Sequence, residues 1–341
     1  MSNEKIAREL PESTRIFFKV VFIRFIPVHS RTNKFMKEFL SIIFAIWLCS
    51  TSLFAQNPYI VVLGIGQDAG VPQMGCDSPF CKEAWKNLKL RQTVSSIALV
   101  NPKTKERWIF DATPDLPEQF QLLKNFTVDF SNNIAGIFLT HAHIGHYTGL
   151  MYLGRESMNT KDVKVYAMPR MKEMLEKNAP WSQLVSVKNI SLQRLENKQN
   201  TKISENISVQ PFLVPHRDEF SETVGFKIMV NSKSLVFIPD IDKWQKWSEK
   251  LEDVVKSSDY VLIDGTFYAD GEINRPMSEV PHPFVSETVD LLKDMPLKEK
   301  NKVYFIHFNH SNPLVQGNKN KIKELKTKGF NLTFQGQKFN F

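Results

Sequence analysis

Three histidines that fall within six residues constrain this chain more than any other feature of its sequence. His141, His143 and His146 follow the apolar run AGIFLT, and the whole chain of 341 residues contains eight histidines. Histidines two apart at the frayed end of a strand can point the same way, and His146 follows at the turn into the next predicted helix. Imidazole suits zinc, and a catalytic zinc takes about three protein ligands and keeps one position open. The cluster therefore predicts a metal site, and a set of surface loop histidines is the alternative.

Further candidate ligands stand at the ends of later apolar runs. His216 ends PFLVPH, Asp240 ends SLVFIPD, and His307 lies in VYFIHFNHSN. Each is expected where a strand meets its loop, and loops gather at sheet edges to form sites. Taken singly, each residue fits a structural role equally well. Taken in order, HxHxxH, then His, Asp and His form a far more specific pattern.

Short β-rich runs alternate with amphipathic stretches after residue 58, which indicates an α/β layered domain. No internal repeat or long Pro/Gly/Ser linker divides the chain, so we expect one domain over 58–341. The expected strands span 59–66, 95–101, 107–112, 135–141, 163–168, 207–215, 224–230, 234–240, 260–265 and 302–308, and the expected helices span 116–125, 145–157, 171–177, 243–255, 286–293 and 319–328.

The basic excess of the chain is concentrated at its beginning. The net charge is +8, and residues 1–35 carry seven basic and three acidic side chains, so half of the excess lies there. No Arg/Lys run with interleaved aromatic residues accompanies the remainder. We therefore expect a small-molecule substrate and no nucleic-acid partner, and the oligomeric state stays open.

The stretch FLSIIFAIWLCSTSLFA has the plan of a signal peptide. It follows Lys34 and Lys37, ends in small residues, and is shorter than the roughly 20 apolar residues of a membrane span. We expect an upstream extension without function over 1–35, a signal peptide over 36–55, and a mature chain that is exported to the periplasm or beyond. A membrane anchor and a lipoprotein modified at Cys49 are the alternatives.

Two cysteines, Cys76 and Cys81, remain after the leader, in VPQMGCDSPFCKEAW. In an oxidising compartment such a close pair forms a disulfide. Thiolates with a nearby Asp or His also hold structural zinc. The residues alone leave both interpretations open.

The ordered motifs resemble those of the metallo-β-lactamase superfamily, and within it those of the pyrroloquinoline quinone biosynthesis protein B (PqqB) family and the phosphoribosyl cyclic phosphodiesterases. The resemblance covers about residues 59–310. It implies a four-layered αββα sandwich with metals at one edge of the paired sheets. The motifs are LGIGQDAGVPQMGCDSPFC, LTHAHIGHYTGLMYLGRE, VPHRDEFSETVGF, FIPDID, LIDGTF and HFNHSNP.

The resemblance also implies a ligand set. His141, His143 and His216 correspond to a first metal site, Asp240 to a bridging carboxylate, and His146 and His307 to a second site. The superfamily pattern HxHxDH places Asp where this chain has Gly145, and glycine supplies no ligand oxygen. The expectation is therefore one zinc, with the second site weakened and iron as an alternative metal.

A second departure concerns the cysteines. Related families often show Cys-x-Cys-x-x-Cys around a structural zinc, whereas this chain has Ser78 at the middle position. The loss of that thiolate, together with export, favours a disulfide, although Asp77 offers a substitute ligand.

Two functions from different classes follow from the resemblance. The first is an exported metal-dependent hydrolase of a phosphodiester, ester or lactam-type bond, in which the metal activates water and Asp240 holds it. His282 and His310 are the candidate acids for the leaving group. Arg217, Glu222 and Asp264 are candidates for contacting substrate or orienting ligands. The second is a non-hydrolytic PqqB-like protein, either an oxidative iron enzyme or a carrier of a small molecule.

Overall fold

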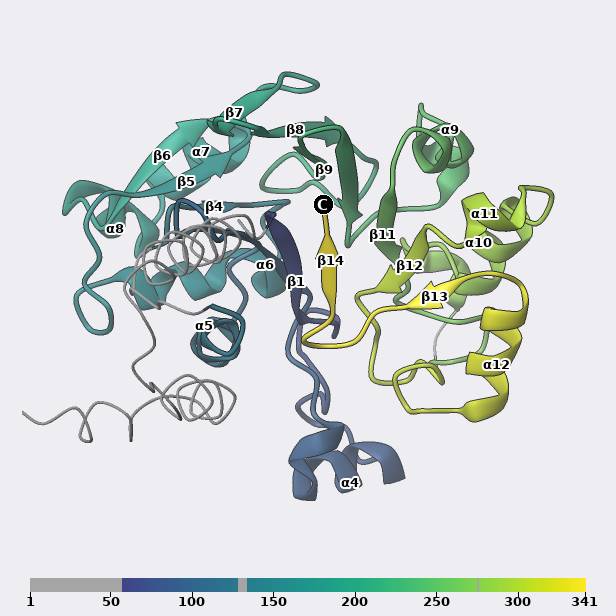
Figure 1. The fold of residues 1–341 in the computed structure, drawn as a ribbon. Coiled ribbons are helices and arrows are strands. Elements are labelled where there is room, and N and C mark those ends of the chain that lie inside the picture. The colour runs from purple at the N-terminus through teal and green to yellow at the C-terminus, as the bar shows by residue number, and fades with distance from the viewer. Residues whose placement is uncertain (1–56, 128–133, 275) are drawn as a thin grey trace, which may run out of the picture. The chain divides into compact units, whose positions relative to one another are not determined.

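Two seven-stranded sheets organise the part of the chain that the computed structural model describes, residues 57–127, 134–274 and 276–341 (Figure 1). The first sheet has the order β14 (Lys338–Asn340), β1 (Tyr59–Gly64), β2 (Ser96–Asn101), β3 (Glu106–Phe110), β4 (Gly136–Phe138), β5 (Val163–Ala167) and β6 (Ile190–Arg194). The second has the order β13 (Asn331–Leu332), β12 (Val303–Ile306), β11 (Tyr260–Asp264), β10 (Lys233–Ile238), β9 (Val224–Val230), β8 (Ile207–Leu213) and β7 (Thr201–Ser204).

Helices cover the outer faces of both sheets (Figure 1). The helices α5 (Leu116–Lys124), α7 (Pro169–Lys177) and α8 (Trp181–Ser186) bury apolar side chains against the first sheet, and α9 (Leu251–Lys256), α10 (Val285–Leu291) and α12 (Lys319–Thr327) do so at the second. This is the expected αββα sandwich. The other helical segments are α4 (Pro79–Lys86), α6 (Ile144–Tyr147), α11 (Leu297–Lys300), η1 (Leu88–Leu90), η2 (Thr148–Leu153), η3 (Trp244–Lys246) and η4 (Met277–Glu279).

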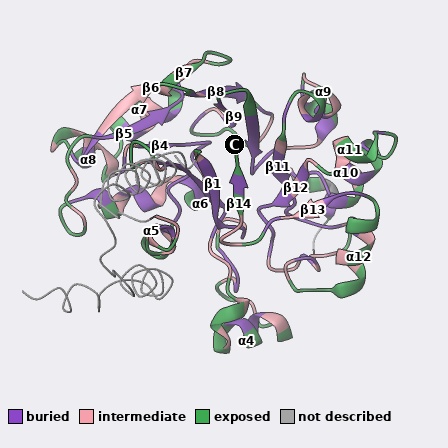
Figure 2. Ribbon diagram, in the orientation of Figure 1, coloured by how far each residue is buried: buried purple, intermediate pink, exposed green. Residues whose placement is uncertain are grey.

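Strand β1 shows why four layers form. All six of its residues are buried (Figure 2). Ile60 and Val62 join the core that includes the second sheet, whereas Tyr59, Val61 and Leu63 join the core beneath α5, α7 and α8. Because successive side chains point to opposite faces, a strand that is apolar at every position must be covered on both sides.

An aromatic cluster joins the two sheets. Phe110, Phe138 and Tyr166 stack across β3, β4 and β5 with centroid distances of 4.9 and 4.3 Å. Phe226 of β9 meets Phe110 and Phe138 edge-on at 5.5 and 5.6 Å. Such contacts stabilise more than their buried area alone, and they fix one sheet against the other.

Parallel pairing brings the loops of the site together. Strands β3 to β6 are parallel, and so are β10 to β13. The carboxyl ends of parallel strands share one edge of a sheet, so the segments after β3, β4, β10, β11 and β12 gather there.

Two expected helices are wrong in part. The segment expected as a helix over 243–255 is divided into η3 and α9. Trp244 donates to Thr288 Oγ1 at 2.8 Å, and Trp247 donates to the carbonyl of Leu213 at 3.0 Å. The two indoles are held by different elements, and the backbone is extended at Trp247.

The helix expected over 145–157 becomes the short α6 followed by η2. Gly149 lies so close to the preceding chain that an added Cβ would be 2.0 Å from the Thr113 carbonyl oxygen. Residues 148–153 form the tighter 3-10 helix η2 in place of an α-helix, which accommodates this close approach.

The expected upstream extension and signal peptide lie outside the described residues and remain predictions, as does the domain boundary at residue 58. In the three described ranges, no helix combines the length and apolar character needed to cross a membrane.

Candidate metal centre

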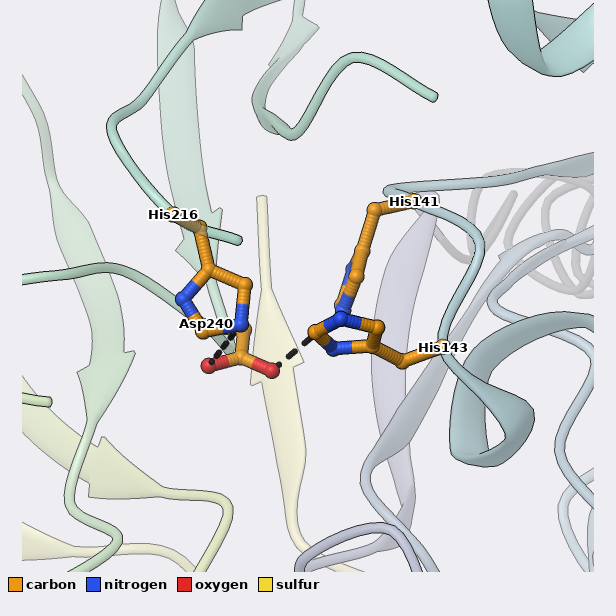
Figure 3. Close-up of side chains that lie close together, drawn as sticks. All are labelled: His141, His143, His216 and Asp240. Atoms are coloured by element: carbon orange, nitrogen blue, oxygen red, sulfur yellow. Dashed lines mark ion pairs between the residues drawn. The ribbon is translucent and has the colours of Figure 1, made fainter. Parts of the chain in front are cut away.

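The first group of potential ligands contains residues from both sheets. His141 and His143 follow β4, His216 follows β8, and Asp240 follows β10. Their ligand atoms all lie within 4.8 Å of one another. His141 Nε2 is 3.4 Å from Asp240 Oδ2, and His216 Nε2 is 3.3 Å from Asp240 Oδ1. Figure 3 shows the four side chains converging, with His141 and His143 on one side and His216 and Asp240 on the other.

A second group shares Asp240 with the first. It consists of Asp68, His146, Asp240 and His307, again with ligand atoms within 4.8 Å. His146 Nε2 is 3.1 Å from Asp68 Oδ1 and 3.7 Å from Asp240 Oδ2. His307 Nε2 is 3.9 Å from the same two oxygens. The sequence predicted His146 and His307 here but missed Asp68.

Unsatisfied polar atoms show that these groups fit a metal. Buried polar atoms normally form hydrogen bonds, and each exception requires an explanation. Several such atoms without a hydrogen bond converge here: Asp68 Oδ1, His141 Nε2, both nitrogens of His143, His146 Nε2, both nitrogens of His216, Asp240 Oδ1 and His307 Nε2. Imidazole nitrogens and carboxylate oxygens are zinc ligands, so a divalent cation would satisfy them together.

The protonation states agree with this interpretation. Burial holds the pKa of His141 well below its usual value and also lowers the pKa values of His143 and His307. Burial alone would raise the pKa of Asp240, but the charges of nearby histidines outweigh it and hold that pKa well below its usual value. Neutral imidazoles beside an ionised carboxylate are the forms that bind metal.

His146 faces two carboxylates. Burial lowers the pKa of His146, but Asp111 and Asp68 more than offset burial and hold the pKa well above its usual value. Asp68 is held ionised in turn, because the adjacent His146 lowers its pKa against the effect of burial. A cation between Asp68 and His146 would replace this proton.

A buried carboxylate and a threonine orient the histidines of the first sheet. Asp111, directly after β3, lies 2.7 Å from His146 Nδ1 and accepts from Thr140 Oγ1 at 2.9 Å. Thr140 Oγ1 is also 3.0 Å from His141 Nδ1. Because Thr140 donates to Asp111, it accepts from His141, and both imidazoles leave Nε2 free for a metal.

The second sheet repeats this arrangement. Asp264 lies 2.8 Å from His282 Nδ1 and accepts from Thr266 Oγ1 at 2.7 Å. Thr266 Oγ1 is 2.9 Å from His307 Nδ1. His282 Nδ1 is also 3.2 Å from Asp240 Oδ1. Burial lowers the pKa of His282, but Asp264 and Asp240 outweigh burial and raise it to about 9.

The remaining predicted residues lie around this centre. Glu222 accepts from the backbone N–H groups of Arg170 and Met171 at the start of α7, so it anchors that helix. Arg217 is exposed beside the first group, where its charge lowers the pKa of His143.

Cys76 and Cys81 are joined by a disulfide, and the ring of His310 lies close to both sulfur atoms. His310 also lines a cavity of about 350 Å³ together with Asp68, Phe267 and Asn309. It therefore lies beside the second ligand group without belonging to it.

Two of the missed residues, Asp111 and Thr140, left weak signals in the sequence. Asp111 ends an apolar strand, as the predicted residue Asp264 does. Thr140 directly precedes the histidine cluster. Asp68 has no comparable signal, because it lies in the loop after β1, far from HxHxxH in the chain.

Paired sheets covered by helices, with His/Asp groups that share Asp240 at one edge, define a metal-binding αββα protein. Residues 106–308 match the family model of the beta-lactamase superfamily domain. The chain belongs to the metallo-β-lactamase superfamily.

Similar proteins cover nearly the whole described region. The chain is 26% identical over 307 residues to coenzyme PQQ synthesis protein B of Acinetobacter baumannii (strain ACICU), which covers 82% of this chain and 98% of the relative. Zn(2+)-bound PqqB from Methylobacterium extorquens superposes with a TM-score of 0.70 at 22% identity, over 83% of this chain and all of that one. A diphosphatase from the PhnP family gives a TM-score of 0.59 at 20% identity, over 83% and 98%. These two structures establish likeness of fold.

Proposed function

We propose that this protein is a metal-dependent hydrolase of a small molecule with a phosphodiester, ester or lactam-type bond. The observation that carries the proposal is the convergence of unsatisfied imidazole and carboxylate atoms on Asp240. His141, His143, His216 and Asp240 would hold a metal, with zinc as the first choice. Such a metal polarises a substrate oxygen and makes water more acidic.

The chain's own groups have defined tasks in this proposal. Asp240 and the histidines hold and orient the reacting groups, while Asp111 and Asp264 fix the imidazole rings. His282 is the candidate acid, since Asp264 holds its Nδ1 and leaves Nε2 to carry a proton to the leaving group. His310 is the second candidate acid, because it lines the cavity that Asp68 also lines.

The cavity of about 350 Å³ is the candidate substrate site because Asp68 is part of both its wall and the second ligand group. A larger cavity of about 570 Å³ lies against α10 and α12 and shares no residue with either group. Proximity to the ligand atoms decides between the two, since the bond to be cleaved must reach the metal.

The test is turnover by the full-length protein on a panel of phosphodiester, ester and lactam substrates after zinc loading. We expect His141→Ala and Asp240→Ala to lower kcat/KM by at least about a hundredfold, because several kcal/mol of transition-state stabilisation are lost. Asp253→Ala, at an exposed position of α9, is the control and should leave turnover unchanged. No turnover by the zinc-loaded protein on any member of the panel would refute hydrolysis.

The match to coenzyme PQQ synthesis protein B over 98% of that relative's length favours a second candidate function. In that case the protein acts on or carries a quinone-like small molecule without hydrolysis, with iron as the alternative metal. Iron in the protein as purified, combined with absent hydrolysis, would select this function.

Export is a separate part of the proposal and rests on the sequence of residues 36–55. Fractionation of cells should yield a shortened chain that begins near Gln56 outside the cytoplasm. Recovery of only full-length chain in the cytoplasm would contradict export.

A further inference from the structure

The space that a side chain at residue 145 would enter is occupied by the carboxylate of Asp68. A Cβ added to Gly145 would lie 2.4 Å from Asp68 Oδ1 and 2.5 Å from Asp68 Cα. Real Cβ atoms do not approach other atoms so closely, so any side chain at residue 145 requires Asp68 to move. The volume that an Asp side chain would enter at residue 145 thus already contains a carboxylate, supplied from a different part of the chain.

The loop that carries Asp68 is held on both sides. The N–H of Gln67 donates to the carbonyl of Phe308 at 2.9 Å, and the N–H of Phe308 donates to the carbonyl of Ile65 at 2.7 Å. Val71 and Gln92 exchange two further backbone hydrogen bonds of 2.8 Å. The backbone on each side of Asp68 is therefore paired, and one of these pairs adjoins His307. The loop presents Asp68 to the metal centre in a fixed position.

The charge around the centre also fits two cations. Asp111, Asp240 and Asp264 are buried, and the side chain of Asp68 is 26% exposed. Among the described residues, the ion-pair partners of these carboxylates are histidines. Buried charges require compensation. Four carboxylates in so small a volume carry enough negative charge to compensate more than one divalent cation.

We propose that Asp68 supplies the carboxylate of a second metal site, with His146, His307 and the shared Asp240, and that Gly145 is glycine to make room for it. The carboxylate of the superfamily pattern has thus moved from the helix start at residue 145 to the loop after β1. This inference deepens the proposed function, because it assigns a second metal to the same centre. It is tested by metal binding, which does not depend on turnover.

The experiment measures zinc per chain by elemental mass spectrometry after saturation and removal of free zinc, with competition titration for affinity. Wild type should hold two zinc ions, and Asp68→Asn, which keeps the shape but loses the charge, should hold one. Gly145→Asp alone should also hold fewer than two, because its side chain collides with Asp68. The exchange variant Asp68→Gly with Gly145→Asp should restore two. Asp253→Asn, a change at an exposed aspartate of α9, is the matched control and should hold two.

The outcomes separate this inference from the proposed function. One zinc in wild type, two zinc ions in Asp68→Asn, or no recovery in the exchange variant would overturn the role of Asp68. Recovery in the exchange variant supports it and also shows that loss in Asp68→Asn is not a folding defect. Two zinc ions without turnover on the substrate panel would refute the hydrolase while leaving the second site intact.

Discussion

At the scale of single residues, an unusual backbone conformation positions two residues of the centre. Asp111 and His307 both have positive φ values, 67° and 66°, which are uncommon for residues with side chains. Backbone strain of this kind is concentrated at functional sites, where the surrounding structure maintains it. Here it occurs at the ends of β3 and β12, where the chain turns to bring an orienting carboxylate and a ligand into the centre.

We expect Asp111→Asn to weaken zinc binding about 10- to 100-fold, because the amide is a poorer acceptor for His146 Nδ1–H and leaves that ring less well fixed. Competition titration with a chromophoric chelator measures the change. Asp162→Asn is the matched control, since Asp162 is an exposed aspartate that also has a positive φ of 52°. Equal zinc affinity in Asp111→Asn and the control would show that Asp111 does not orient the ligand.

Most of the candidate metal ligands could be predicted from the sequence. The six predicted ligands all fall in the two groups of the structure, because each stands next to a recognisable apolar run. Asp68 could not be predicted, since its proximity to Gly145 arises from pairing between the loop after β1 and residue 308. Such contacts across the chain leave no local pattern.

At the scale of elements, hydrophobic periodicity located the strands well because most are buried and β-rich. It failed where tertiary contacts override local preference, as for the helix expected over 243–255, which divides so that Trp244 and Trp247 bond to different partners. It also missed β6 and β7, whose residues are largely half-buried and polar. Edge strands of this kind lack the apolar signal on which the prediction depends.

The packing between the two sheets should depend strongly on the aromatic ring of Phe226. Phe226→Ala is expected to lower the free energy of unfolding by about 3–5 kcal/mol, because Phe226 is fully buried against Phe110 and Phe138. Urea unfolding measures the effect. Phe334→Ala, at a residue that is 61% exposed, is the control and should change stability little. A similar loss in both variants would show that the inter-sheet cluster is not a principal source of stability.

At the scale of the whole molecule, the two sheets meet at a centre rich in buried carboxylates. A metal that binds only the folded state stabilises it, by about 2.7 kcal/mol at a free concentration of 100 Kd. Chelation should therefore lower Tm by several degrees, and added zinc should restore it. Asp240→Ala, which removes the ligand shared by both groups, should show a much smaller response to chelation. An unchanged wild-type Tm would indicate that metal contributes nothing to the folded state.

A crystal structure of the zinc-loaded protein, with anomalous diffraction data on both sides of the zinc absorption edge, tests the metal centre most directly. We expect two zinc peaks, one among His141, His143, His216 and Asp240 and the other among Asp68, His146, Asp240 and His307. Absence of zinc from both groups, or zinc bound only elsewhere in the molecule, would contradict the assignment of this edge as the metal centre.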